Sequence, residues 1–118
     1  MDTQHTATND VILITTDCLG TGVRELGEIL MKSFLNKLCD AELRPARIIL
    51  INDGVRLATE GSKVLEPLAF LEKEGVSVLS CGTCLEYYKL KDKLKVGQVT
   101  TMDNIVSYLL TASKVIKI

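Results

Sequence analysis

Four cysteines carry the clearest chemical potential of this 118-residue sequence, and two of them, Cys81 and Cys84, form a Cys-Xaa-Xaa-Cys motif. The motif follows an apolar segment typical of a buried strand, 76–80, and precedes a segment with a helical pattern. A thiol just before a helix N-terminus lies near free amide groups and the positive end of the helix dipole, which favour the thiolate. Since the thiolate is the form that attacks sulfur, we predict that Cys81 is a reactive residue.

The residues beside Cys81 support this prediction. Gly82 allows the backbone to come close to a bound anion or persulfide, and Gly82 or Thr83 leads into the following helix. Cys84 lies three residues further on, so it either points back to the same cleft or faces the core. Cys81 and Cys84 are therefore the candidate catalytic residues, with Gly82 and Thr83 in supporting positions.

Other uses of the cysteines are less well supported. A zinc site needs four ligands, but there is no second Cys-Xaa-Xaa-Cys motif and the only histidine is His5, so we predict no metal. A helix between Cys18 and Cys39 would hold them about 25 Å apart, beyond disulfide reach. We interpret Cys39 as a small buried hydrophobe. Cys18 is either a packing residue at a strand end or a supporting residue of the site.

Polar side chains end two further strand segments. Asp17 ends the segment 11–17, and Asn52 and Asp53 end the segment 47–53. Because parallel strands share one carboxyl edge, we expect these side chains at the edge where Cys81 lies. They either position a substrate or partner or cap the loops that follow. The segment 17–22 lacks the third glycine of a dinucleotide-binding turn and no phosphate-binding loop follows, so we predict no cofactor.

Short apolar segments alternate with amphipathic ones along the chain. This alternation is typical of a parallel sheet covered by helices, that is, an α/β fold. The predicted strands are 11–17, 47–53, 76–80, 98–101 and 114–118, and the predicted helices are 22–40, about 66–74, 85–94 and 102–112. We expect residues 1–10 to be a polar, disordered leader and residues 11–118 to form one domain.

Two of these helices are expected to bury an apolar stripe. The stripes comprise Leu26, Ile29, Leu30, Phe34, Leu35 and Leu38 in the first helix, and Ile105, Val106, Leu109 and Leu110 in the last. The segment 54–61 has glycine at both ends and no periodicity, which predicts a loop long enough to cover a site.

The composition argues against several classes of partner. The 14 basic and 15 acidic side chains give a net charge of −1, whereas nucleic-acid binders carry a basic excess in stripes. No apolar run approaches the roughly 20 residues that span a bilayer, and the polar N-terminus lacks a signal-peptide core. We therefore predict a cytoplasmic protein without nucleic-acid or membrane partners. In that compartment cysteines more often serve thiol chemistry than disulfides.

Six short motifs follow one another along the chain: DCLGTG at 17–22, LGEILMKSFL at 26–35, NDGVRL at 52–57, EGS at 60–62, CGTCL at 81–85 and VGQVT at 96–100. In this order they resemble the DsrE-like C-terminal domain of YedF-type proteins, and the resemblance runs from about Val11 to Ile118. It implies a DsrE/TusD-type fold, a three-layer α/β/α domain whose five-stranded parallel sheet has the order 4-3-2-1-5.

The resemblance also implies sulfur-relay chemistry. In this superfamily a cysteine just after the third strand carries sulfur as a persulfide and passes it to a partner, and Cys81 occupies that place, whereas Cys84 falls where relatives often have serine or alanine. A trimeric or hexameric homo-oligomer is implied, and selenium is an alternative cargo. YedF-type chains usually begin with a TusA-like domain that carries a Cys-Pro motif. Neither Pro45 nor Pro67 directly follows a cysteine, so we expect an acceptor, such as a TusA-like protein, to act in trans.

Three functions therefore stand as hypotheses. In the first, a sulfurtransferase-like carrier, Cys81 takes sulfur from a donor protein and Cys84 resolves or stabilises the persulfide. In the second, Cys81 and Cys84 cycle through a disulfide as a dithiol redox protein. In the third, the chain is a non-catalytic homo-oligomeric binding module.

Overall fold

Five parallel strands form the sheet at the centre of the computed structural model, which describes residues 5–118. The strands are β2 (Asp10–Ile14), β4 (Arg47–Leu50), β5 (Ser77–Cys81), β6 (Gln98–Thr100) and β7 (Lys114–Lys117), and their order is β6-β5-β4-β2-β7. Numbered along the chain, this order is 4-3-2-1-5, which confirms the prediction. All neighbouring strands pair in parallel, so their carboxyl ends meet at one edge.

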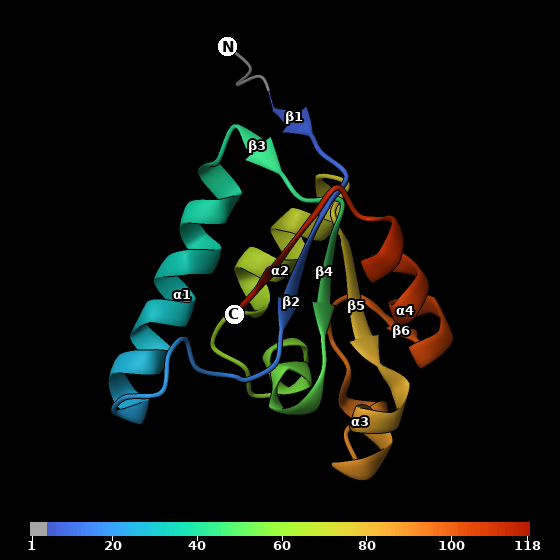
Figure 1. Ribbon diagram of the computed structural model, residues 1–118. Helices are drawn as coiled ribbons and strands as arrows, with labels where there is room; N and C mark the ends of the chain where they lie inside the picture. Colours follow the sequence, from blue (N-terminus) through green and yellow to red (C-terminus); the bar gives the residue numbers. More distant parts are fainter. Residues whose placement is uncertain (1–4) are drawn as a thin grey trace.

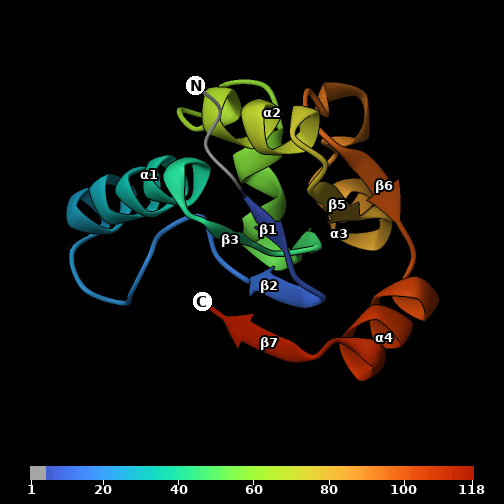
Figure 2. The same cartoon turned by 90° about the horizontal axis from the view of Figure 1, so that it is seen from above.

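Helices cover both faces of the sheet, so the fold is a three-layer α/β/α domain. The helices α1 (Arg24–Asp40) and α2 (Leu65–Lys73) lie on one side, and α4 (Met102–Thr111) lies on the other (Figure 2). The short helix α3 (Gly82–Tyr87) lies at the carboxyl edge, toward which the strands point (Figure 1). A 3₁₀ turn, η2 (Lys91–Lys93), follows α3.

Alternate strand residues supply two apolar cores. On the side of α1 and α2, Ile12, Ile14, Ile48 and Leu50 pack with Met31, Leu35 and Leu68, and each of these side chains is at most 4% exposed. On the side of α4, the smaller core comprises Val11, Ile49, Cys81 and Ile105. The period-two alternation of the strands therefore places Cys81 on the α4 side.

Residues 54–58 of the segment predicted to be a loop over the site belong instead to the 3₁₀ helix η1 (Asn52–Ala58). Val55 and Ala58 are fully buried, so most of η1 belongs to the core and does not form a cover. Its apolar residues contact the sheet and α2, an arrangement that periodicity in so short a segment does not reveal.

The helix predicted at 85–94 begins and ends earlier. It starts at Gly82 directly after β5, and it stops at Tyr87 because Lys89 adopts a left-handed backbone with φ of 59°. The other helices and the five sheet strands lie within a few residues of their predicted bounds.

The prediction of a buried apolar stripe on α1 is partly wrong. Leu26, Ile29 and Leu30 are 53, 59 and 41% exposed, whereas Gly27, Met31 and Leu35 form the buried face. Gly27 explains why the helix is rotated about its axis relative to the prediction, since only a residue without a side chain fits here: a Cβ would lie 2.7 Å from the Cβ of Cys18. The helix approaches the β2 side of the domain through that contact and turns its larger apolar residues outward.

The stripe expected on α4 is also partly wrong. Ile105 is buried and Leu109 is half-buried, but Val106 and Leu110 are 47 and 81% exposed. Together with the exposed Met102 they form a row at i, i+4 and i+8 on the outer face, which we call the α4 stripe.

Two residues of the expected leader form a short strand. The strand β1 (Thr6–Ala7) pairs in parallel with β3 (Leu43–Arg44), and β2 begins at Asp10. The buried guanidinium of Arg44 donates to the Cys39 carbonyl oxygen and contacts His5 Nε2, which ties the strand β1 to the end of α1. Residues 1–4 of the predicted leader lie outside the described residues. Between residues 5 and 118, no helix combines the length and the apolar character that crossing a bilayer requires.

Candidate functional site

The predicted site residues lie at the carboxyl edge of the sheet, but they form two groups. Cys81, the last residue of β5, lies next to Cys84, and Cys84 in turn contacts Asn52 beyond the end of β4. Asp53 follows Asn52 in η1. Asp17 and Cys18 follow β2 and contact the start of α1 instead.

Cys81 occupies the N-cap position of α3, as the sequence predicted. Its side chain is 1% exposed and packs with Val11, Ile49 and Ile105 under α4. A donor molecule therefore has no direct access to this sulfur in the described conformation.

Cys84 is half-buried and lies in the first turn of α3. Its Sγ accepts a hydrogen bond from the main-chain N–H of Asn52 across 3.1 Å. Burial raises the pKa of the Cys84 thiol above its usual value, and the Asn52 amide opposes that rise. The neighbouring Cys81 thiol raises the pKa of Cys84 further, through a hydrogen bond and through its charge. The two thiols of the motif are thus close enough to influence each other.

Asn52 connects this pair to a second layer of polar contacts. The hydroxyl of Tyr88 donates to Asn52 Oδ1 across 2.9 Å, and the guanidinium carbon of Arg56 lies 4.2 Å from the centre of the Tyr88 ring. Arg56 Nε also donates to Asp53 Oδ1 across 3.0 Å. This hydrogen bond holds the pKa of Asp53 below its usual value, and burial together with the Asp53 carboxylate raises the pKa of Tyr88.

Tyr88 and Arg56 were not predicted as site residues. For Tyr88 the sequence offers one signal: it lies four residues after Cys84, a spacing that places the two side chains on the same side of a helix. The contact of Arg56 with Tyr88 joins segments 32 residues apart and has no counterpart in any local pattern.

Asp17 and Cys18 serve the start of α1. Both carboxylate oxygens of Asp17 accept from Arg24, at 2.6 and 3.3 Å, and Cys18 Sγ lies 3.8 Å from the Arg24 carbonyl oxygen. Burial raises the pKa of Cys18. Cys18 thus packs below Gly27 and does not join the Cys81–Cys84 pair.

The remaining predicted residues lie apart from the polar contacts. Gly82 approaches β6, because a Cβ there would lie 3.1 Å from the Val99 side chain, so its small size serves packing and not an open ligand site. Thr83 is exposed.

Cys39 is half-buried with its Sγ 3.5 Å from the Pro67 carbonyl oxygen, and burial raises its pKa. All four cysteines are free thiols, and the residues from 5 to 118 bring no three His, Cys, Asp or Glu side chains together as metal ligands.

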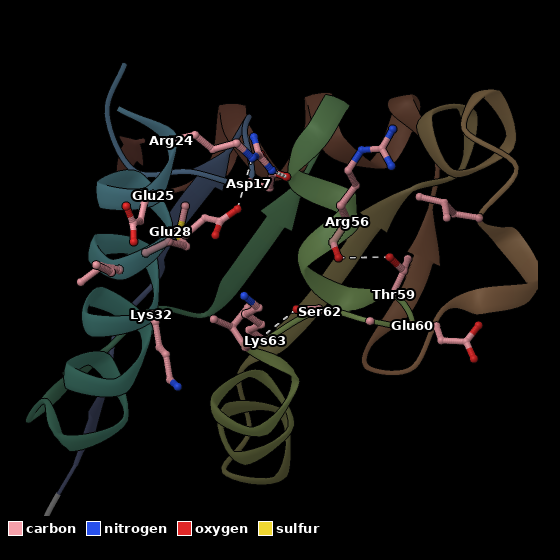
Figure 3. A pocket seen from close by; sticks show the side chains of 15 residues that line it. Asp17, Arg24, Glu25, Glu28, Lys32, Arg56, Thr59, Glu60, Ser62 and Lys63 are labelled. Atoms are coloured by element: carbon pink, nitrogen blue, oxygen red, sulfur yellow. Dashed lines mark hydrogen bonds and ion pairs between the residues drawn. The ribbon is translucent and has the colours of Figure 1, made fainter. Parts of the chain in front are cut away.

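A pocket of about 500 Å³ lies beside the site, between α1 and the segment 59–64 (Figure 3). Met31, Val64 and Leu90 form apolar parts of its wall, and charged side chains of both signs surround them. Asp17 and Arg56 line it, whereas Cys81 and Cys84 do not. Arg56 connects the two features, because it lines the pocket and also contacts Tyr88.

Comparisons with known proteins identify the fold. No model of a known protein family matches the chain, and no curated protein matches it. The solved structure of the YchN protein from E. coli has a TM-score of 0.64 at 19% identity and covers 98% of this chain and 100% of its own. MTH1491 from Methanobacterium thermoautotrophicum, of unknown function, has a TM-score of 0.68 at 21% identity and covers 92% and 97%.

A third structure agrees with these two. BT1422 from Bacteroides thetaiotaomicron, also of unknown function, has a TM-score of 0.63 at 16% identity and covers 93% of this chain and 95% of its own. At such identities the likeness shows the fold alone. The chain has a DsrE-like fold.

Proposed function

We propose that this protein is a sulfur-relay carrier whose working thiols are Cys81 and Cys84. The observation that carries the proposal is the hydrogen bond from the Asn52 amide to Cys84 Sγ, at the carboxyl edge where an α/β domain places its chemistry. A main-chain donor aimed at sulfur stabilises a thiolate or a persulfide. The DsrE-like fold and the motif resemblance to YedF-type domains support the same chemistry.

The difference in burial between Cys81 and Cys84 indicates which thiol exchanges sulfur with the donor. The sequence placed the persulfide on Cys81, but Cys81 is 1% exposed whereas Cys84 is half-buried and hydrogen-bonded. We therefore assign the first exchange with the donor to Cys84 and keep Cys81 as its inner partner.

The exchange needs no oxidant. The Cys84 thiolate attacks the outer sulfur of a donor persulfide, the S–S bond of the donor breaks, and the donor leaves as a thiolate. Cys84 then carries the outer sulfur as a persulfide. An acceptor thiolate attacks that same sulfur, which forms the acceptor persulfide and returns Cys84 to its thiolate form.

A dithiol redox function is the second candidate, and the packing of Cys84 against the cluster that contains Cys81 favours it. If the Cys81 thiolate attacks the inner sulfur of the Cys84 persulfide, hydrosulfide leaves and a Cys81–Cys84 disulfide remains. The same geometry thus supports sulfur transfer or disulfide formation, and the acceptor decides which occurs.

The partners follow from the same proposal. The donor is a protein or small molecule that bears sulfane sulfur, and the acceptor is a TusA-like protein acting in trans, with selenium as an alternative cargo. We further propose a homo-oligomer that buries the α4 stripe, since Met102, Val106 and Leu110 present a continuous apolar row to solvent.

Radiolabelled cysteine and a cysteine desulfurase test the carrier function. The protein should acquire a label that survives non-reducing gel electrophoresis and is removed by a reductant. Cys84→Ser should lose most of the label, while Cys39→Ser, a variant at a cysteine outside the site, should retain it. Label that persists in Cys84→Ser but not in Cys81→Ser would return the carrier role to Cys81, and no label in the wild-type protein would favour the binding-module hypothesis.

A further inference from the structure

We infer that Asn52 and Tyr88 are positioning residues that hold a hydrogen-bond donor against the Cys84 sulfur and thereby set its reactivity. The inference deepens the proposed function of the same site. It rests on the geometry of one turn between β4 and η1 and on the way in which α3 contacts that turn.

The turn itself is unusual in its backbone. Asn52 has φ of 55°, and Lys89 is the one other non-glycine residue with positive φ in the range 5–118. Asparagine tolerates the left-handed region better than most residues, but the conformation still needs support from its surroundings. Ile51 before it is extended, so the left-handed step at Asn52 turns the chain into η1 at the point where its N–H meets Cys84 Sγ.

The segment from Cys84 to Tyr88 holds Asn52 at two points. Cys84 Sγ accepts from the main-chain N–H of Asn52, and one helical turn later the Tyr88 hydroxyl donates to the side-chain Oδ1 of the same residue. The second contact fixes the residue whose backbone makes the first. Tyr88 therefore acts on the sulfur through Asn52.

The Tyr88 ring is in turn held in place. Arg56 lies over the ring at 4.2 Å, and its Nε is anchored by the Asp53 carboxylate at 3.0 Å. Because Asp53 and Arg56 both belong to η1, the ring is held by the same helix that begins at Asn52. The ring, the amide side chain and the sulfur thus form one connected arrangement that spans η1 and α3.

The chemical consequence concerns the negative form of the sulfur. Burial disfavours a thiolate at Cys84, and the neighbouring Cys81 thiol adds to this effect, whereas the Asn52 N–H opposes it. A hydrogen bond to the sulfur stabilises its charged form more than its neutral form. Loosening Asn52 should therefore make Cys84 harder to ionise.

The pH dependence of Cys84 alkylation by iodoacetamide, followed by peptide mass spectrometry, tests this inference without any sulfur donor. Tyr88→Phe should move the alkylation midpoint of Cys84 upward by about 0.4 to 1 pH unit. Tyr87→Phe is the matched control, since Tyr87 is the adjacent, 83% exposed tyrosine, and it should leave the midpoint unchanged.

Asn52→Gly supplies the second arm. Glycine keeps the N–H and the positive φ but removes the side chain that Tyr88 contacts, so the Tyr88→Phe shift should disappear in the Asn52→Gly background. A Tyr88→Phe shift of equal size in both backgrounds, or no shift with Asn52 intact, would overturn the inference. If the midpoints respond as expected but the protein accepts no sulfur, the proposed function fails while the positioning role stands.

Discussion

The main-chain amide of Asn52 and the sulfur of Cys84 are joined by a 3.1 Å hydrogen bond. This bond links the turn after β4 to the first turn of α3. The bond places a half-buried thiol beside a fixed donor. The other thiol of the motif, Cys81, lies beneath it in the apolar core on the α4 side. Because one sulfur is half-buried and the other is fully buried, we assign them different roles in sulfur transfer.

Gly54 should be essential to the turn that carries Asn52. A Cβ at this position would overlap the carbonyl oxygen of Ile14, so Gly54→Ala must displace η1 from the end of β2. We expect a loss of about 1–3 kcal/mol in the free energy of unfolding, measured by urea denaturation. Gly22→Ala is the control, because nothing lies within 4 Å of a Cβ there. Equal stabilities of the two variants would contradict the packing described at Gly54.

The free energy of unfolding should fall at alkaline pH. Burial raises the pKa of Cys18 and Cys39 above the usual 9.0, so above that pH the unfolded chain releases protons that the folded chain still holds. Stability is therefore full below about pH 9 and declines as the pH rises through the folded-state values. Urea titrations across this range should show the decline, and Cys39→Ala should make it less steep. A decline of unchanged steepness in Cys39→Ala would show that this thiol is not involved.

Arg56 should control the acidity of Asp53. Its hydrogen bond is the main cause of the lowered pKa of that carboxyl, and Arg24 contributes least among the groups that lower it. Carboxyl-carbon NMR titration should therefore show a clear rise in the pKa of Asp53 in Arg56→Ala. Arg24→Ala should cause a smaller rise, and the reverse ranking would contradict the contact described between Arg56 and Asp53.

The α4 stripe should be an interface between copies. If a homo-oligomer buries it, Leu110→Glu should lower the mass measured by sedimentation equilibrium, because a carboxylate would have to enter an apolar contact. Tyr87 is as exposed as Leu110 but lies outside the stripe, so Tyr87→Glu should leave the mass unchanged. A wild-type monomer, or an oligomer that tolerates Leu110→Glu, would show that this stripe is not the interface.

The sheet and the position of the cysteine motif were predictable because their signals are local. Apolar segments such as 47–53 identify strands by composition, and the step from strand to helix at Cys81 places this residue at a carboxyl end. The strand order followed from the motif resemblance and not from periodicity. The structure agrees with each of these predictions.

The orientation of the helices and the contacts of the site were not predictable for the opposite reason. The helix α1 has apolar residues around much of its surface, so Leu26 and Leu30 fit a buried stripe as well as Met31 does, and the deciding contact is between Gly27 and Cys18. Similarly, Asn52 and Cys84 are 32 residues apart, and their hydrogen bond depends on a left-handed turn that the sequence does not specify. Both features arise from packing across the fold.

Peptide-level mass spectrometry of the reduced protein after exposure to polysulfide shows whether the protein takes up sulfur and on which thiol. We predict one additional sulfur atom on the peptide that contains the Cys81–Cys84 motif, located on Cys84 by fragmentation and removed by a reductant. Cys81→Ser should retain this adduct and Cys84→Ser should lose it. A Cys81–Cys84 disulfide formed without added sulfur, or an adduct confined to Cys18 or Cys39, would contradict the account of this protein as a sulfur carrier.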